Sequence, residues 1–366
     1  MNEYLSPDIL EDEFVKNFSL LLILQKYLGL SRVDLRHRFV LPPTIWQKLF
    51  SVLWLIFVFY FCHMTFTVFN DIVAYSGIYY AYVISVVFQA MSVSNIIHTR
   101  FFNGEDNANF YIKLQNIDRL LKIAGNDMIS HILYRFSIVF VTMVIISNSV
   151  GMYDIINNSY MEVLGAAYTQ ICLFIDIYHC CHVIIYFYVR LCFINAIIIN
   201  HLEENPIRLN PGKGILPTRN RMLYLASLSH NFASSETDVY LNELLDCFAN
   251  LNELYKFQMP QSFRSYIKIC ATILVVYDFC IILIIPLILG VFLNEVQKTK
   301  RLCTKVMVLN NEGPLRKRAS DMLKRIKQKP PTFLVYNIWV MEPYTVINII
   351  KIFTTLAITV LQFMYL

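Results

Sequence analysis

Six stretches of the chain are long and apolar enough to cross a lipid bilayer. A helix that spans the hydrocarbon core needs about 20 apolar residues. Hydrophobic residues make up 57% of the chain and charged residues only 16%, whereas a soluble domain is about 45–50% apolar. The sequence therefore predicts an all-α integral membrane protein, with spans at residues 46–69, 77–99, 132–153, 163–200, 265–293 and 340–366.

Lysine and arginine alternate between the loops, and this alternation predicts the orientation of the chain. Residues 1–45 carry five of these residues, residues 100–130 carry four, and residues 201–262 carry five. The loops at 70–76 and 154–162 carry none. Because basic loops stay on the cytoplasmic side, we expect a cytoplasmic N-terminal segment at 1–45, four spans within 46–200, and a cytoplasmic helical loop at 201–262.

The alternation breaks at residues 294–338, which carry eleven basic residues. This charge predicts a cytoplasmic segment, but a single span at 265–293 cannot join two cytoplasmic loops. A helix of 29 residues reaches about 43 Å, which is too short for two crossings of a core about 30 Å thick. Two interpretations remain: the segment re-enters the membrane near Pro286 or Gly290, or it contains merged or shortened spans.

Two cytoplasmic segments have amphipathic helical patterns. Residues 236–258 place six apolar side chains near one face, namely Val239, Leu244, Leu245, Phe248, Leu251 and Leu254. Residues 296–327 form a basic amphipathic stretch. This stretch contacts either lipid headgroups or a cytoplasmic helical bundle that holds subunits together.

The last segment, residues 339–366, contains a stripe of polar side chains along its span. Counting at 3.6 residues per turn aligns Tyr344, Asn348, Lys351, Thr355 and Gln362 within about 40° of one line. Such a stripe avoids lipid, so it lines a pore between subunits or forms hydrogen bonds inside one bundle. Lys351 would repel cations unless it lies in a wide inner mouth or extends toward the headgroups.

The fourth span carries Asp176, His179, Tyr186 and Arg190 on one face, and Gln89 adds a polar group to the second span. A carboxylate inside a membrane needs a partner or water. The face therefore lines a ligand cavity that opens outward, or it forms an internal Asp–His pair that stabilises packing.

Catalytic and metal sites are not predicted. Consecutive ligands in "HCCH" at 179–182 point around the helix circumference, unlike the spaced pairs of structural zinc sites. The motifs GxSxG, HExxH and the phosphate-binding loop are absent from the chain. We expect no enzyme activity, no cofactor and no nucleic-acid partner.

The end of the chain resembles the closing signature of insect gustatory receptors, which is Thr-Tyr, five hydrophobic residues and then Gln-Phe. Here the signature reads Thr355, Leu356, five apolar or small residues, Gln362 and Phe363. "KYLGL" before the first span and "LNELYKFQ" before the fifth also resemble that family. The chain departs from the pattern at Leu356 and in having six clear spans, whereas the family has a seven-transmembrane helical bundle.

The resemblance implies a ligand-gated, non-selective cation channel in the plasma membrane of sensory neurons. Four subunits, identical or mixed, would surround the last helix, and Gln362 and Phe363 would form the outer gate. The ligand would be a small tastant, and the relatively short, divergent chain favours a bitter or unassigned compound. On physical grounds alone, the candidates that bind it are the polar groups Asp176, His179, Tyr186 and Gln89. The alternatives are an odorant receptor of the same superfamily and a non-conducting membrane receptor or scaffold.

Overall fold

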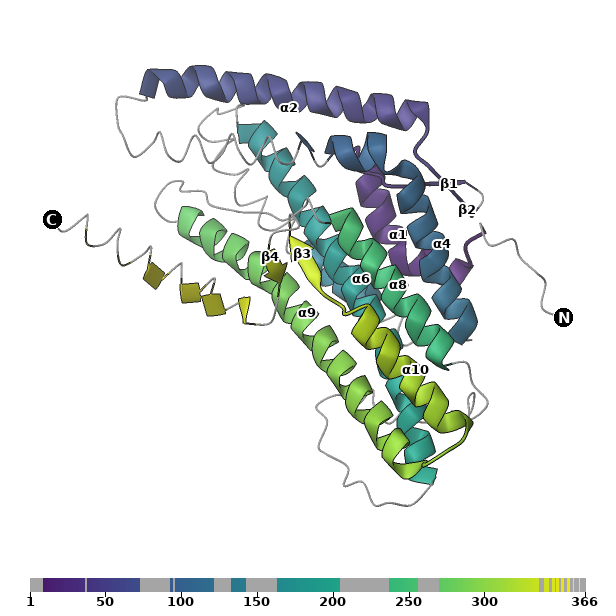
Figure 1. Ribbon diagram of the computed structural model, residues 1–366. Coiled ribbons are helices and arrows are strands. Elements are labelled where there is room, and N and C mark those ends of the chain that lie inside the picture. The colour runs from purple at the N-terminus through teal and green to yellow at the C-terminus, as the bar shows by residue number, and fades with distance from the viewer. Residues whose placement is uncertain are drawn as a thin grey trace.

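The computed structural model describes residues 9–36, 38–72, 93–94, 96–121, 133–142, 163–204, 237–255, 270–335, 339–341 and ten single positions between 344 and 362. Most of these residues are helical (Figure 1). The elements are α1 (Asp12–Tyr27), β1 (Asp34–Arg36), β2 (Phe39–Leu41), α2 (Ile45–Ile72), η1 (His98–Phe102), α4 (Gly104–Leu121), α6 (Val163–Glu204), α8 (Thr237–Tyr255), α9 (Cys270–Leu309), α10 (Pro314–Gln328), β3 (Phe333–Val335) and β4 (Trp339–Met341).

The long helix α6 is the centre of the molecule. It has 42 residues, which corresponds to a length of about 63 Å. It packs against α2, α8 and α9, and it also contacts α1. Its segment Phe174–Leu202 is, within the described part of the chain, the one helix long and apolar enough to cross a membrane, although most of it is buried inside the protein. Residues 77–92 and 143–153 of the predicted second and third spans lie outside the described residues.

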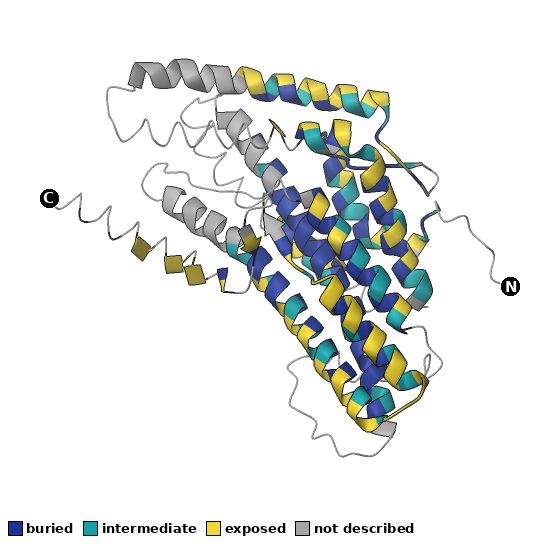
Figure 2. Ribbon diagram, in the orientation of Figure 1, coloured by how far each residue is buried: buried dark blue, intermediate teal, exposed yellow. Residues whose placement is uncertain are grey.

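The helix α2 presents an apolar face that no other described element covers. Ile45, Trp46, Leu53 and Ile56 are each more than half exposed, while Leu55 and Val58 are buried. Figure 2 shows this alternation of exposed and buried residues along the described half of the helix. The first predicted span therefore lies within a single helix, and its segment Ile45–Tyr60 is apolar.

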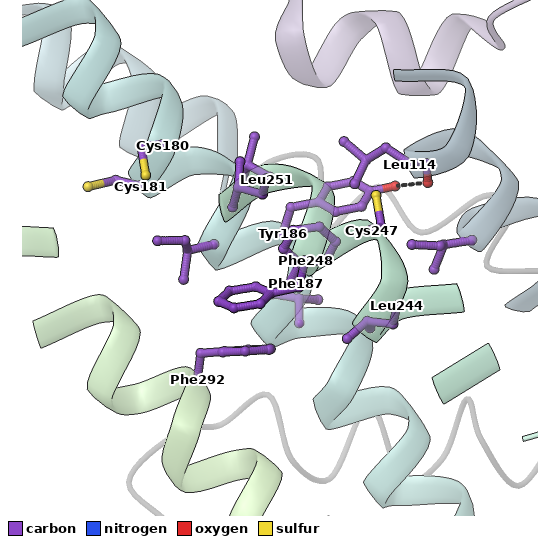
Figure 3. Close-up of a cluster of buried hydrophobic side chains, with 14 of the residues drawn as sticks. Leu114, Cys180, Cys181, Tyr186, Phe187, Leu244, Cys247, Phe248, Leu251 and Phe292 are labelled. Carbon is purple, nitrogen blue, oxygen red and sulfur yellow. Dashed lines mark hydrogen bonds between the residues drawn. The ribbon is translucent and has the colours of Figure 1, made fainter. Parts of the chain in front are cut away.

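Helices α6, α8, α9 and α10 form a bundle at the end of the molecule that carries the basic residues (Figure 1). Phe187 of α6 packs edge-on against Phe248 of α8, and Phe248 stacks on Phe292 of α9 with a ring-centre distance of 4.8 Å (Figure 3). The amphipathic helix expected at 236–258 is confirmed over Thr237–Tyr255, and residues 256–258 lie outside the described residues. Val239 is the exception on its predicted apolar face, because it is 40% exposed at the start of α8.

The helix α9 runs without interruption through Pro286 and Gly290. The re-entrant turn that the sequence allowed at these positions is therefore wrong. A proline removes one backbone donor, but neighbouring helices and local adjustments satisfy the freed groups in an apolar environment, so the helix continues.

The basic segment after α9 lies on the same side of the molecule as the loop that contains α8. Helices α8 and α10 are in contact. Lys329 forms an ion pair with Asp246 of α8, and Arg318 lies 3.8 Å from Asp238. These contacts favour a position of residues 294–338 on the same side as the loop 201–262, as the basic charge predicts. Strict alternation of the loops would put the two segments on opposite sides.

Short antiparallel hairpins follow α1 and α10. β1 pairs with β2, and β3 pairs with β4 in a register that joins Phe333 to Met341. The last span was expected to begin at residue 340, but Trp339–Met341 form the strand β4, and the described helical positions begin at Thr345. Aromatic and β-branched residues at 339 and 340 favour this extended pairing.

Candidate functional site

The polar stripe predicted for the last helix is exposed in the isolated chain. Side chains of Tyr344, Asn348, Lys351, Thr355 and Gln362 are all exposed, and all but Tyr344 are helical. The Thr355 hydroxyl donates to the carbonyl oxygen of Lys351 at 2.9 Å. The signature residues Leu356 and Phe363 lie outside the described residues, so the gate formed with Phe363 stays a prediction.

Apolar side chains lie near this stripe as well. Ile347 and Ile358 are more than half exposed and stand one turn or less from Tyr344, Thr355 and Gln362. Hydropathy does not predict whether these isoleucines are buried or exposed in the chain, because an apolar residue in a span can contact either protein or lipid. The exposed face is therefore a mixture of amide, hydroxyl and aliphatic groups.

The candidate ligand residues of α6 are buried and bonded to protein groups. Asp176 Oδ1 accepts a hydrogen bond from Arg32 Nη2 at 2.9 Å, and the two side chains are only 8% and 1% exposed. Arg32 comes from the loop after α1, which the sequence places in the cytoplasm. The two charges neutralise each other inside the protein, which is how a buried carboxylate is stabilised.

His179 lies one turn further along α6 and contacts α4. The Tyr111 hydroxyl is 2.7 Å from His179 Nε2. Burial raises the pKa of Tyr111, so this hydroxyl keeps its proton and can donate it to the imidazole nitrogen. The neighbouring Cys180 and Cys181 are buried free thiols, and within the described residues no three metal-ligating side chains converge.

Tyr186 and Arg190 both bind Asp118 of α4. Arg190 donates to both carboxylate oxygens, with Nε–Oδ1 at 2.8 Å and Nη2–Oδ2 at 3.0 Å. The Tyr186 hydroxyl donates to Oδ2 as well, and the Arg190 guanidinium stacks 3.5 Å above the centre of the Tyr186 ring. A bidentate pair of this kind fixes both distance and orientation between the two helices.

The loop between α1 and β1, residues 28–33, joins three further elements. Tyr168 of α6 donates to the carbonyl oxygen of Leu28 at 2.7 Å, and Ser51 of α2 donates to that of Gly29 at 2.7 Å. Arg100 of η1 donates to the carbonyl oxygen of Ser31. Burial lowers the pKa of Arg100 to about 10, so the guanidinium is still protonated at neutral pH. We call residues 28–33 the junction loop.

For the side-chain interactions of Asp176, His179 and Arg190, sequence reasoning identified the partner on α6 and missed the partner on the other element. Arg32, Tyr111 and Asp118 lie in segments that hydropathy marks as cytoplasmic, more than 60 residues away from their partners on α6. The one available signal was that a carboxylate such as Asp176 requires a cation. Gln89, the fourth ligand candidate, lies outside the described residues.

Neither the models of known protein families nor the curated proteins contain a match to this chain. The conclusions about function therefore rest on the residues and contacts given above. Arg32, Tyr111 and Asp118 occupy the face of α6 that was assigned to a ligand, so this face packs against protein. It does so through the pairs Asp176–Arg32 and His179–Tyr111, which the sequence did not predict, and the ligand role of Asp176 and His179 stays a prediction. The exposed stripe on the last helix is the remaining candidate site.

Proposed function

We propose that the protein is a chemosensory, ligand-gated cation channel of the gustatory receptor type, whose pore is lined by the last helix of several subunits. The observation that carries this proposal is the exposed stripe of Tyr344, Asn348, Lys351, Thr355 and Gln362. Amides and hydroxyls on a spanning helix avoid lipid because unpaired polar groups are costly there. When several subunits assemble symmetrically around the last helix, the stripe faces a water-filled pore instead of lipid.

Two further features support a membrane location for the channel. The uncovered apolar face of α2 has side chains that match lipid. The basic bundle of α6, α8, α9 and α10 fits the cytoplasmic side, where lysine and arginine are retained. In this arrangement the bundle lies below the membrane, and the full seven-span architecture of the family is part of the proposal.

Cross-linking between subunits tests the pore without knowledge of the ligand. In Gln362→Cys, a cysteine near a central axis should form disulfide-linked dimers on mild oxidation, since copies approach one another there. Ile350→Cys is the matched control, because Ile350 is also exposed but lies on another side of the same helix. Equal cross-linking of the two variants would count against a pore at the stripe.

Currents test conduction directly. In cells that respond to a panel of bitter compounds and sugars, Gln362→Ala should change relative cation permeability or gating, whereas Ile350→Ala should not. A non-conducting membrane scaffold is the second candidate, and it is favoured by the protein groups that fill the Asp176 face. Efficient cross-linking of Gln362→Cys together with no current from any compound would support the scaffold.

A further inference from the structure

The helix α10 carries a serine in the middle of its exposed basic face. Ala319, Met322 and Ile326 are buried and hold the helix in the bundle. Ser320 is exposed on the opposite face. Counting at 3.6 residues per turn places four exposed basic residues within about 60° of Ser320, namely Arg316, Lys317, Lys324 and Lys327.

We propose that Ser320 is a phosphorylation site for a serine/threonine protein kinase that recognises basic residues upstream of its acceptor. The run Arg316-Lys317-Arg318-Ala319 directly precedes the serine. A kinase with an acidic substrate groove binds such a run through charge complementarity. In the reaction, Ser320 Oγ forms a bond to the γ-phosphorus of ATP. The bond from that phosphorus to the bridging oxygen breaks, ADP leaves, and the hydroxyl proton passes to the catalytic aspartate of the kinase.

The start of α10 can open to fit an extended groove. The helix begins at Pro314, and its N-cap residue Gly313 has no side chain that could accept from the free amide groups of the first turn. Residues 314–318 bury little, since only Leu315 and Arg318 are half-buried, although unwinding as far as the serine also releases the buried Ala319. Met322 and Ile326 lie beyond the serine and keep the rest of the helix docked while the first turns unwind.

Phosphate on Ser320 would change the charge of this face. A phosphoserine adds about −1.5 to −2 charges at pH 7. Arg316 and Lys324 stand one turn before and one turn after Ser320, so both can pair with the phosphate in the refolded helix. The unmodified face repels its own copies, which argues against its burial between identical subunits and leaves the serine open to a cytoplasmic kinase.

Thr304 on α9 is a natural comparison within the same chain. It is exposed, and Arg301 stands three residues before it. Thr304 lies in the interior of a 40-residue helix, however, and its hydroxyl donates to the carbonyl oxygen of Lys300 at 2.9 Å. Because the helix continues on both sides, we expect no phosphate there, even in the variant Thr304→Ser.

The experiment uses the full-length protein in lipid nanodiscs, the catalytic subunit of cyclic-AMP-dependent protein kinase, and ATP, with sites mapped by mass spectrometry. We expect phosphate on Ser320, none at position 304 in Thr304→Ser, and a rate at least tenfold lower in Arg316→Ala/Lys317→Ala. The proposal would be overturned if Ser320 stayed unmodified while a reference peptide in the same reaction was fully phosphorylated. It would also be overturned if the double variant were phosphorylated at the same rate as the wild type. Phosphorylation is measured without recording a current, so a negative result here would not bear on the channel proposal.

Discussion

At the residue scale, α6 is tied to the N-terminal part of the chain by buried charges. Asp176 pairs with Arg32, and Arg190 pairs with Asp118. Taking a charge out of water is costly, and its partner offsets this cost only when both remain in place. These pairs therefore set the position of α6 relative to the junction loop and α4. Removing one partner should lower the stability of the fold, and any change in ligand binding would follow from that loss.

The buried pair gives the first prediction. Asp176→Asn leaves the Arg32 charge without its carboxylate and should cost about 3–5 kcal/mol of unfolding free energy, measured by thermal unfolding in detergent. Arg32→Met/Asp176→Leu removes both charges and should recover most of that loss. The control is the surface pair of Arg38 and Asp12, which are 54% and 71% exposed, so Asp12→Asn should cost only about 0–1 kcal/mol. A stable Asp176→Asn variant would show that the pair does not position α6.

Gly29 in the junction loop gives the second prediction. Its φ is +69°, and a Cβ at this position would lie 2.8 Å from Trp54 Cδ1. Gly29→Ala therefore combines backbone strain of about 1–2 kcal/mol with a steric clash. Gly104→Ala is the control, since Gly104 has no positive φ and its added Cβ would lie 3.1 Å from Pro43 Cδ. Thermal unfolding should show a larger loss for Gly29→Ala, and equal losses would mean that the contact with Trp54 is relaxed.

At the element scale, the basic bundle depends on the contact between α9 and α10. Cys303 of α9 is buried, and its Sγ lies 4.0 Å from Met322 Sδ of α10. Burial raises the pKa of Cys303 to about 12. Since the thiolate is the reactive form, this thiol should be inert at neutral pH as long as α10 stays docked.

Thiol labelling tests the docking of α10. N-ethylmaleimide at pH 7 should leave Cys303 unmodified in the wild type and should modify it in Met322→Ala, where lost packing costs about 2–5 kcal/mol. Lys324→Ala on the exposed face is the control and should keep the thiol protected. Rapid labelling of Cys303 in the wild type, read by mass spectrometry, would contradict the packed bundle.

At the scale of the whole molecule, α8 and α10 are in contact, so in the proposed membrane arrangement both loops lie on the same side of the bilayer. An epitope tag inserted after Asn311, in the exposed turn between α9 and α10, should be labelled only after cells are permeabilised. In the channel arrangement, a tag after Leu366 should be labelled on intact cells. Labelling of Leu366 only after permeabilisation would place Gln362 at the inner face and would remove the proposed outer gate.

The amino-acid sequence by itself determined the properties that depend on local pattern. Apolar length predicted helices at α2, α6 and α9, and periodicity predicted the buried face of α8 from Leu244 to Leu254. The count of basic residues predicted that 294–338 lies on the same side as the loop 201–262, and α10 does contact α8. Each of these follows from residues a few positions apart, because helical geometry repeats every turn.

Only the tertiary structure decided how these elements combine. The partner of Asp176 is 144 positions away, and no periodicity relates such residues, because their approach depends on the packing of every helix between them. The same holds for the uninterrupted course of α9 past Pro286, for the strand at Trp339–Met341, and for the exposure of Val239. Local pattern specifies which surfaces must be covered, whereas packing of the whole chain decides which residues cover them.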